Sequence, residues 1–569
     1  MATPLLDTAA PGAGAAVVPA EQVSQPDPMF PTLTPAQVAR MAAHGRARRV
    51  VEGEVLVEPG TESARFFLVT EGQLDILLPS RATEDLVRVV RPGQFTGEVN
   101  VLSGRRGLAR IRAGAPGAVI EVAREDLLSL VQTDSELSEI LMRAFLLRRT
   151  DIVARRLGDV VLIGSDHSPG TLRVKEFLTR NGYPYVSLDL DRDASVQEML
   201  DRFHVGVADV PVVICRCKIV LRNPSNQEIA DCLGFNDAVD RTQVRDLVIV
   251  GAGPAGLAAA VYGASEGLEV LVLEATAPGG QAGASSRIEN YLGFPMGISG
   301  QKLAEAAYAQ AAKFGAQVMI AGSATRLACD RKPYAVELGD GQRVPARVVI
   351  IATGAEYRRL PLANVSQFEG AGIYYAATFM ESQLCSGEDV VVVGGGNSAG
   401  QAAVFLAENA RRVHVLIRSD GLADTMSRYL VRRIEEHPAI ALHVRTELVG
   451  LEGQEHLERV RWRDNPSGRV ETHPIRHVFS MTGAVPSTDW LQSCVARDAK
   501  GFLKTGPDLS PEDLAAAHWP LARPPHLLET SLPGVFAVGD VRSGSVKRAA
   551  SAVGEGSIAI AAVHQVLHE

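Results

Sequence analysis

Hydrophobic and polar positions alternate in short runs near the start of the chain and change to a helical spacing after residue 126. The runs 50–60 and 66–74 are rich in Val, Phe and Leu and are broken by glycines, which is typical of short strands joined by turns. Over 126–149, apolar residues recur every three or four positions, which predicts a helix. Together with a short helix over 34–46, this pattern predicts a β-roll closed by helices at residues 29–150.

The stretch 159–235 alternates apolar runs with amphipathic segments, as expected of a compact α/β unit. The pattern predicts three strands and two helices in this stretch. They are a strand at 160–164, a helix at 171–181, a strand at 185–188, a helix near 196–203 and a strand after Val210-Pro211.

From residue 246 onward, a buried-strand pattern leads into a glycine-rich turn and a helix on two occasions. The first is the apolar run 247–250, followed by a G-x-G-x-x-G turn over 251–256. Such a turn uses glycines for a tight reversal, for close approach of the backbone to a pyrophosphate, and for helix packing. The next strand ends at Glu274, whose carboxylate suits the ribose hydroxyls of an adenosine. This segment therefore predicts a dinucleotide site.

The second glycine-rich turn follows the apolar run 389–393 and fits G-x-G-x-x-A over 394–399. Its next strand, 413–417, ends at Arg418, where the first site has Glu274. A cation at that place suits a 2′-phosphate and so indicates NADPH rather than NADH. The alternative is an arginine that only faces solvent.

Length and charge limit the classes of protein to which the chain can belong. Its 569 residues suggest about three to five domains at roughly 150 residues each. The charge sum of 57 − 66 = −9 shows no basic excess that would favour nucleic-acid binding. The hydrophobic share of 46% supports a large core, whereas residues 1–28, rich in Ala, Pro and Gly, predict a flexible tail.

Targeting signals and cysteine usage favour a cytoplasmic protein. The first basic residue is Arg40, so a signal peptide's basic start is missing, and no apolar run approaches the roughly 18 to 20 residues of a membrane-spanning helix. Six cysteines are too few for a disulfide scaffold at this length. No metal site is predicted. The cysteines are Cys215, Cys217, Cys232, Cys329, Cys385 and Cys494.

Residues 246–569 resemble the low-molecular-weight thioredoxin reductases, a family of pyridine-nucleotide flavoproteins. The resemblance implies an FAD-binding domain in two parts, 246–360 and 485–569, with an NAD(P)H-binding domain, 361–484, inserted between them. Its fold class is α/β with two Rossmann-like domains, and its members are usually homodimers. Besides the two glycine turns, the matching motifs are Pro278-Gly279-Gly280-Gln281, Glu289-Asn290, Ile351-Ala352-Thr353-Gly354 and Gly534-Val535-Phe536-Ala537-Val538-Gly539-Asp540.

The same resemblance implies the residues that contact each cofactor. Asp540 would bind the FAD ribityl chain, and the pair Arg548-Ala549 would lie near the pyrimidine edge of the flavin. NADPH, or alternatively NADH, would contact Gly394, Gly396, Asn397, Ser398, Ala399 and Arg418. FAD would contact Gly251, Gly253, Pro254, Ala255, Gly256, Glu274, Gly280, Gln281, Asn290, Thr353, Gly354, Gly539, Asp540, Arg548 and Ala549.

One motif of the family is missing from this sequence. Thioredoxin reductases carry a C-x-x-C pair ahead of the second glycine turn, and the aligned residues here are Ala376-Ala377-Thr378-Phe379. Without a thiolate, no dithiol relay operates at that position. Cys385 lies close by as a lone thiol. Electrons would then leave the reduced flavin directly, to a quinone, an iron–sulfur partner, oxygen or an external disulfide.

The stretch 159–235 resembles the glutaredoxin/thioredoxin fold. Val210-Pro211 matches the cis-proline strand that faces the active site in that fold, and the resemblance predicts a cis peptide there. The C-P-Y-C motif is replaced by Ser168-Pro169-Gly170-Thr171, which indicates a degenerate domain used for packing or docking. The alternative is a displaced redox pair formed by Cys215 and Cys217.

Residues 29–150 resemble the cyclic-nucleotide-binding domain. Phe95-Thr96-Gly97-Glu98 matches the start of its phosphate cassette, but the position of the phosphate-binding arginine is occupied by Gly107. Nearby arginines would substitute for it as phosphate ligands, or else form a solvated surface. The roll would therefore either bind a cyclic nucleotide or act as a docking module. The candidate arginines are Arg105, Arg106 and Arg110.

Three functions remain open from the sequence. The first is an FAD-dependent oxidoreductase that passes hydride from NADPH to an unidentified acceptor without a local dithiol. The second is a thioredoxin-disulfide reductase that uses Cys215 and Cys217. The third is a non-catalytic flavin or nucleotide redox sensor controlled by the roll.

Overall fold

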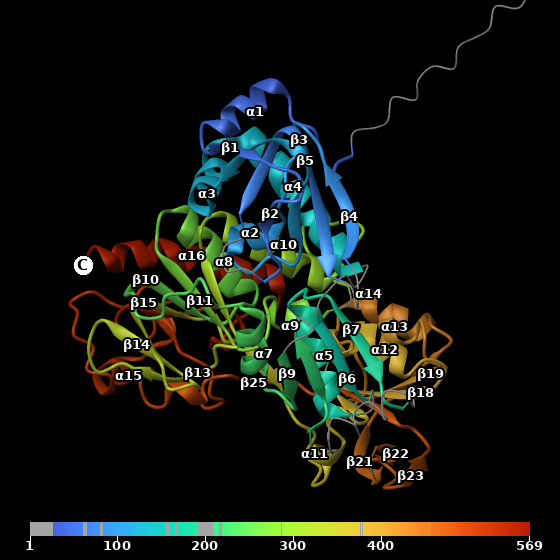
Figure 1. The fold of residues 1–569 in the computed structure, drawn as a ribbon. Helices are drawn as coiled ribbons and strands as arrows, with labels where there is room; N and C mark the ends of the chain where they lie inside the picture. The colour runs from blue at the N-terminus through green and yellow to red at the C-terminus, as the bar shows by residue number, and fades with distance from the viewer. Residues whose placement is uncertain are drawn as a thin grey trace, which may run out of the picture.

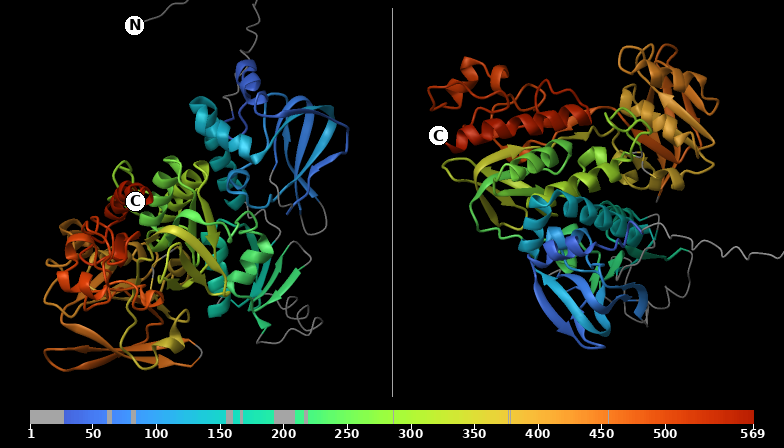
Figure 2. Two further views of the ribbon diagram at one scale, coloured as in Figure 1. Left: turned by 90° about the vertical axis from the view of Figure 1, so that its left-hand side faces the viewer. Right: turned by 90° about the horizontal axis from the view of Figure 1, so that it is seen from above.

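The structure is a computed structural model that describes residues 27–60, 65–79, 84–154, 160–165, 168–191, 209–215, 219–285, 287–375, 377, 379–454 and 456–569. It contains four units: the roll (27–154), the middle unit (160–235), the first nucleotide unit (245–357 and 484–569) and the second nucleotide unit (358–483) (Figure 1). The roll and the second nucleotide unit lie at opposite ends of the molecule (Figure 2). The predicted helix near 196–203, Cys217, Ala376 and Thr378 lie outside the described residues.

The roll is an antiparallel sheet covered by helices. Its strand order is β1-β5-β3-β4, with β2 also paired to β5, and three buried phenylalanines, Phe66, Phe95 and Phe145, fill its core. The strands are β1 (Arg46–Val50), β2 (Val55–Val57), β3 (Phe66–Pro79), β4 (Glu84–Val90) and β5 (Arg110–Val122). The helices are α1 (Pro35–Ala42), α2 (Val99–Ser103), α3 (Arg124–Thr133) and α4 (Ser135–Ala154).

One prediction for the roll was wrong in detail. The helix predicted over 126–149 is two helices, α3 and α4, because the Asp134 carboxylate accepts the Leu137 backbone N–H at 3.0 Å and starts a new helix. Asp27, near the end of the predicted tail, pairs with Arg88 at 3.0 Å.

The middle unit has a four-stranded sheet in the order β7-β6-β8-β9. Strands β6 and β7 are parallel, whereas β8 and β9 are antiparallel, and the Val210–Pro211 peptide is cis. The predicted cis bond is thus confirmed. The elements are β6 (Val160–Gly164), α5 (Pro169–Arg180), β7 (Tyr185–Asp189), β8 (Val212–Cys215), β9 (Ile219–Arg222) and α7 (Asn226–Leu233).

The first nucleotide unit is a twisted sheet with its parallel strands buried on both faces. The order is β12-β11-β10-β15-β14-β13, and β26 returns from the far end of the sequence to pair with β15. The strands are β10 (Arg245–Val250), β11 (Val270–Glu274), β12 (Gln317–Ile320), β13 (Ala324–Ala328), β14 (Tyr334–Leu338), β15 (Arg343–Ile351) and β26 (Val535–Ala537). The helices are α8 (Pro254–Ser265), α9 (Gly280–Gly283), α10 (Gly300–Lys313), α15 (Pro511–Ala516) and α16 (Ala549–Leu567), with short 3-10 turns η2 (Asp489–Leu491), η3 (Gly506–Asp508) and η4 (Gly539–Val541).

The second nucleotide unit repeats the strand–turn–helix arrangement on a smaller parallel sheet, ordered β17-β24-β18-β19-β20. The pair β16 (Ala355–Tyr357) and β25 (Ala484–Pro486) connects it to the first unit. Its strands are β17 (Ile373–Tyr374), β18 (Asp389–Val393), β19 (Arg412–Leu416), β20 (Ile440–His443), β21 (Thr446–Gly453), β22 (Leu457–Asp464), β23 (Val470–His473) and β24 (His477–Ser480). Its helices are α11 (Val365–Phe368), α12 (Phe379–Leu384), α13 (Asn397–Leu406) and α14 (Arg428–Glu436).

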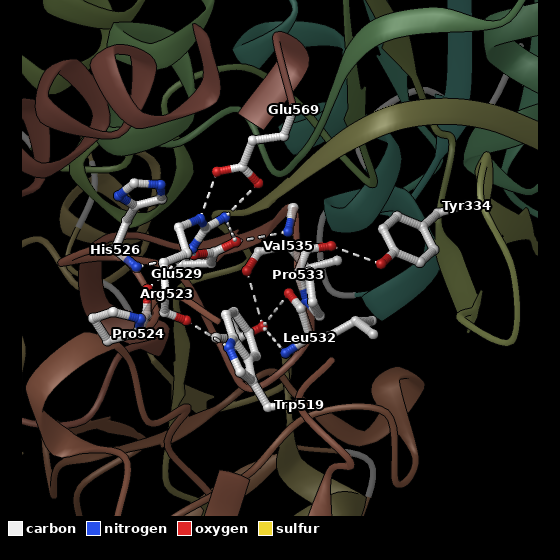
Figure 3. Close-up of polar contacts among 12 residues, drawn as sticks. Tyr334, Trp519, Arg523, Pro524, His526, Glu529, Leu532, Pro533, Val535 and Glu569 are labelled. Carbon is white, nitrogen blue, oxygen red and sulfur yellow. Dashed lines mark hydrogen bonds and ion pairs between the residues drawn. The ribbon is translucent and has the colours of Figure 1, made fainter. Parts of the chain in front are cut away.

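The carboxyl end of the last helix, α16, is joined to the segment before β26 by a partly buried ion network. Arg523 donates to the fully buried Glu529 at 2.7 Å and to Glu569 at 2.9 Å, so its guanidinium joins the two carboxylates (Figure 3). Glu529 also accepts the backbone N–H groups of His526 and Gly534. The network holds the segment before β26 and the end of α16 together, which sets the direction of the helix.

The helix α16 also meets the length and composition test for a membrane span, which the sequence analysis did not anticipate. Within the described part of the chain it is the one helix that does so, and a third of its apolar window is buried. It packs closely against α8, because a Cβ on Gly556 would lie 2.1 Å from the Ala255 carbonyl oxygen. One face of α16 is therefore in close contact with α8.

One disulfide joins distant segments of the first nucleotide unit. Cys329 follows β13 and pairs with Cys494, 165 residues later. The sequence analysis predicted no disulfide scaffold, and among the described residues this bond between a hairpin and the segment after η2 is the one disulfide.

Candidate functional site

A single continuous cavity of about 2330 Å³ lies between the two nucleotide units and the middle unit. It follows the carboxyl ends of β10, β11, β15 and β26 in one sheet, and of β18 and β19 in the other. Ligands of open α/β sheets bind at this edge, and a small-molecule pocket normally occupies about 300 to 1,000 Å³. The cavity therefore has room for two large ligands.

The predicted cofactor residues meet in this cavity, except Gly256 and Ala399, which lie beneath it. The predicted residues that line the cavity are Gly251, Gly253, Pro254, Ala255, Glu274, Gly280, Gln281, Asn290, Thr353, Gly354, Gly539, Asp540, Arg548, Ala549, Gly394, Gly396, Asn397, Ser398 and Arg418.

The first glycine turn has the geometry that its sequence predicts. Gly251 has a φ of +105°, and a Cβ there would lie 2.4 Å from the Ala352 carbonyl oxygen. A Cβ on Gly256 would lie 1.9 Å from the Gly251 carbonyl oxygen, so its absence lets α8 pack onto the turn. Gly253 is the N-cap residue of α8. The turn thus presents the start of a buried helix to the cavity, where an anionic group is stabilised.

Glu274, at the end of β11, supports this turn by accepting backbone hydrogen bonds. Its Oε2 accepts the Ala252 N–H at 2.8 Å, and its Oε1 accepts the N–H groups of Thr276 and Ala277 at 2.8 and 3.1 Å. The residue is 9% exposed and lines the cavity. Since a carboxylate has about four lone-pair sites, acceptor capacity remains for a ribose hydroxyl.

Asp540 follows β26 on the opposite side of the same unit. Burial raises the pKa of its carboxyl group, and the charge of Lys547 partly opposes that shift. Within the described residues the Asp540 side chain accepts no hydrogen bond, while the preceding Gly539 N–H donates to Glu555 at 2.7 Å. A half-buried carboxylate without donors fits a polyhydroxyl chain, whose O–H groups would supply them.

The second glycine turn is supported by a neighbouring loop. Gly394 has a φ of +143°, and a Cβ there would lie 2.3 Å from the Met481 carbonyl oxygen. The Asn397 Oδ1 accepts the Ser427 N–H at 2.7 Å, and Thr425 donates to the Gly395 carbonyl at 2.7 Å. No other atom lies within 4 Å of a Cβ built on Gly396, so the start of α13 is open to the cavity.

Arg418 extends into the cavity after β19 and is exposed. In the part of the chain that the structure describes, its guanidinium makes no ion pair or hydrogen bond, whereas nearby Arg445 pairs with Asp420 at 2.8 Å. An uncommitted guanidinium is suited to a phosphate. The geometry of Arg418 therefore fits the predicted contact with a 2′-phosphate.

The place of the missing C-x-x-C pair is part of the cavity wall. Ala377 lines the cavity, and Phe379 begins α12. No cysteine among the described residues lines it. Cys385, just after α12, is fully buried, and burial raises the pKa of its thiol to about 12. A thiol with that pKa is neutral at pH 7 and is a poor nucleophile.

Cys215 does not line the cavity. It ends β8 and is fully buried, whereas Pro211, at the start of the strand, is beside Gly170 at the cavity end of the middle unit. Four residues of strand separate the two positions by about 13 Å.

The sequence analysis missed the contribution of α5 to the cavity. Arg180 donates to the Gly280 carbonyl oxygen at 2.8 Å. The spacing of Arg173, Glu176 and Arg180 places them on one helix face, but sequence spacing does not indicate which distant segment that face contacts. Six α5 residues line the cavity: Pro169, Leu172, Arg173, Glu176, Thr179 and Arg180.

The arginines proposed as phosphate ligands of the roll have other partners. Arg105 is buried between Phe235 and Tyr308, at 4.7 and 4.9 Å from the ring centres, and burial lowers its pKa. Arg106 pairs with Asp237, and Arg110 pairs with Glu58 at 2.8 Å. Two of these three arginines, Arg105 and Arg106, therefore face the junction of the roll with the middle unit and the first nucleotide unit instead of a ligand.

Glu98 of the same cassette also faces this junction. Both of its carboxylate oxygens are buried and accept no hydrogen bond in the described part of the chain, and the nearest cation is Arg149 at 3.7 Å. Arg149 in turn donates to the Asn181 carbonyl of the middle unit at 3.5 Å. The cassette is thus a contact between units.

Comparison with family models gives two matches. A model described as pyridine nucleotide-disulphide oxidoreductase matches residues 245–556, and one described as cyclic nucleotide-binding domain matches residues 47–134. The first match spans the two nucleotide units, and the second falls in the roll.

The similar proteins cover a little more than half of the chain. The thioredoxin reductase of Ureaplasma parvum is 33% identical over 318 residues, which is 56% of this chain and 95% of that protein. Crystal structures of the thioredoxin reductases of Lactococcus lactis and T. acidophilum align with TM-scores of 0.51 and 0.50. Their identities are 25% and 29%, and each alignment covers 57% of this chain and 99% of the other.

Proposed function

The chain belongs to the pyridine nucleotide-disulphide oxidoreductase family as an FAD-dependent NAD(P)H oxidoreductase, and we propose that it passes electrons from NADPH to a non-thiol acceptor without a dithiol relay. The relatives named above are thioredoxin reductases by name. The proposal departs from that activity at one step, the exit of electrons from the flavin.

The wall around Ala377 carries this proposal. No described cysteine lines the cavity, and the Cys385 thiol, with its pKa raised to about 12, is protonated at neutral pH. The alternative relay through Cys215 and Cys217 is disfavoured, because Cys215 is buried at the end of β8 away from the cavity. A dithiol relay requires a thiolate in contact with the flavin and a partner disulfide.

FAD fits the first half of the cavity. The turn at Gly251 and the start of α8 would hold the pyrophosphate, Glu274 an adenosine ribose, and Asp540 the ribityl chain. Bound FAD supplies two-electron redox chemistry, while the protein supplies position and electrostatics. Burial that raises the pKa of Asp540 makes a hydroxyl-bearing ligand the natural partner of that carboxylate.

NADPH fits the second half. The open start of α13 at Gly396 would take its pyrophosphate, and Arg418 would take the 2′-phosphate. Ser419 and Ala423 stand where a stronger phosphate site would have cations, so we expect a preference for NADPH over NADH that is moderate in size.

Anaerobic mixing of the purified protein with NADPH, and separately with NADH, tests the proposal. We expect the flavin absorbance band near 450 nm to bleach faster with NADPH, and a quinone to restore it. A yellow protein that does not bleach would support the redox-sensor function instead. If the double variant Cys215→Ser/Cys217→Ser loses reduction of an external disulfide while bleaching persists, the relay alternative is correct.

A further inference from the structure

The helix α5 of the middle unit is attached to the first nucleotide unit by hydrogen bonds at the flavin end of the cavity. Arg180 donates to the Gly280 carbonyl oxygen at 2.8 Å, and the Asn181 side chain donates to the Thr276 carbonyl oxygen at 3.0 Å. Asn181 is 6% exposed, so the second bond is sheltered from water. Both acceptors belong to the segment that follows Glu274 and leads into α9.

The other end of α5 touches the segment that leads into the second nucleotide unit. A Cβ built on Gly370 would lie 3.5 Å from the Cβ of Pro169. Gly370 precedes β17, and its N–H donates to the Ile373 carbonyl at 3.0 Å. One helix therefore bridges the two nucleotide units across the cavity.

The end of the middle unit that faces the cavity carries the degenerate Ser168-Pro169-Gly170-Thr171 motif. Gly170 packs against Pro211, with 2.9 Å between a Cβ built there and the proline Cδ. This surface resembles the redox face of a thioredoxin-like domain.

The part of the cavity lining that α5 contributes is mixed in character, and so is the lining from the second nucleotide unit. Leu172 and Arg173 on α5 line the cavity, as do Arg359, Tyr374 and Tyr375. Burial raises the pKa of both tyrosines, so their phenols stay neutral. Aromatic and aliphatic surfaces suit a planar ring, and guanidinium groups suit carbonyl oxygens at its edge.

We propose that α5 is a permanent wall of the reaction site and that the acceptor is a small quinone admitted beside it. This proposal rests on the proposed function. NADPH, one proton and the quinone give NADP⁺ and the hydroquinone: two electrons and two protons convert both carbonyl oxygens to hydroxyls, and no bond to the protein forms. Through α5, the middle unit both excludes protein disulfides from the reaction site and forms one side of the quinone site.

A disulfide placed across the contact tests whether the wall is permanent. In Pro169→Cys/Gly370→Cys the Cβ separation of 3.5 Å lies within the range of about 3.5 to 4.5 Å that a disulfide needs. We expect the bond to form in the full chain without any substrate, as measured by intact mass with Pro169→Cys alone as control. Because Gly370 has a φ of +77°, a side chain there is strained, and Gly370→Cys alone serves as the control for folding. Failure to form the bond when both single variants fold would overturn the docking itself, independently of any activity.

The oxidised and reduced forms of this variant are then compared in two assays, flavin bleaching by NADPH and turnover with menadione. We expect the two forms to differ by less than about twofold in both. Loss of turnover by more than tenfold in the oxidised form, with bleaching retained, would show that the middle unit moves away and would overturn the wall. Absence of bleaching in both forms and in the parent chain would instead contradict the proposed function.

Acceptor size gives the second test. We expect menadione to reoxidise the flavin and oxidised thioredoxin, followed by insulin reduction, to do so at least a hundredfold more slowly. Leu172→Trp adds bulk to the cavity lining and should raise KM for menadione about tenfold, whereas Leu172→Ala should not raise it. Comparable rates with thioredoxin, or an unchanged KM in Leu172→Trp, would rule out a quinone site beside α5.

Discussion

The two glycine turns share a backbone design, but the chain supports them in different ways. The first rests on Glu274, which is 9% exposed and accepts three backbone N–H groups, and it is covered by the middle unit through Arg180. The second is supported by the loop containing Thr425 and Ser427, and its cation, Arg418, is exposed. We therefore expect the first turn to retain its ligand and the second turn to release and rebind one.

This difference follows from the free energy that is lost when the contacts of each side chain are broken. A buried carboxylate with satisfied donors is costly to disturb, because each donor left unpaired costs about 1 to 3 kcal/mol. An exposed guanidinium loses only a screened interaction with a phosphate. An oxidoreductase that holds one cofactor through many cycles and exchanges the other in each cycle needs this asymmetry.

Glu274→Ala should have the largest effect, because it leaves the N–H groups of Ala252, Thr276 and Ala277 without an acceptor. We expect FAD binding to weaken at least about a hundredfold, since three such losses amount to about 3 kcal/mol or more. The flavin-to-protein ratio after gel filtration and titration of the apoprotein measure this. The control is Glu269→Ala, an exposed residue just before the same strand. Normal flavin content in Glu274→Ala would remove the distinction between the turns.

Acid should destabilise the second nucleotide unit more than the first. His414 Nδ1 and His443 Nε2 lie 3.0 Å apart on neighbouring strands of the second unit, and burial together with His443 lowers the pKa of His414 to about 4. Asp389 opposes this shift, whereas Arg412 and His473 add to it. The unfolded chain binds a proton near pH 6.5 that the folded unit refuses down to about pH 4, so stability falls as the pH drops through this range.

The expected loss for the second unit is about 2 kcal/mol between pH 7 and pH 5. Denaturant unfolding followed by the fluorescence of Trp462, which packs 5.4 Å from His414, reports on that unit in a chain carrying Trp490→Phe and Trp519→Phe. His414→Gln should abolish most of the pH dependence. If the variant and the parent lose stability equally, the histidine pair is not the cause.

Arg418→Ala should have a smaller effect, which is confined to the binding of NADPH. Because the guanidinium is exposed, we expect KM for NADPH to rise about tenfold, with KM for NADH and the flavin content unchanged. Arg412→Ala, an exposed arginine at the start of β19, is the matched control. An equal rise for both nucleotides would mean that Arg418 does not contact a 2′-phosphate.

The parts of the site that were predictable are those whose signal lies within one short segment. Gly251 and Gly394 need positive φ and close backbone contacts, and both requirements appear as a glycine at a fixed place after a strand. The helix boundary at Asp134 was missed because α3 and α4 bury the same kind of face in one core, so the apolar spacing continues across the break.

Contacts between distant segments were not predictable from a single sequence. The bond from Arg180 to Gly280 joins positions a hundred residues apart, and nothing local to either marks the other. The arginines of the roll show the same limit, because Arg105 and Arg106 have the residue type expected of a phosphate cassette but turn to Phe235 and Asp237. Residue type indicates which chemistry is available, and the tertiary contacts decide where it is used.

Cys385 gives the smallest expected effect and tests the thiol-free side of the comparison. With a pKa of about 12 and full burial, its thiol should react with iodoacetamide at pH 7 at least a hundredfold more slowly in the folded protein than in denaturant. Cys385→Ser keeps a donor for the Ser382 carbonyl, which now accepts from Sγ at 3.7 Å, so flavin reduction and reoxidation should change by less than twofold. Rapid labelling of the native protein, or loss of reoxidation with flavin reduction intact, would place a working thiol next to the second nucleotide unit. The exit of electrons would then resemble that of a thioredoxin reductase after all.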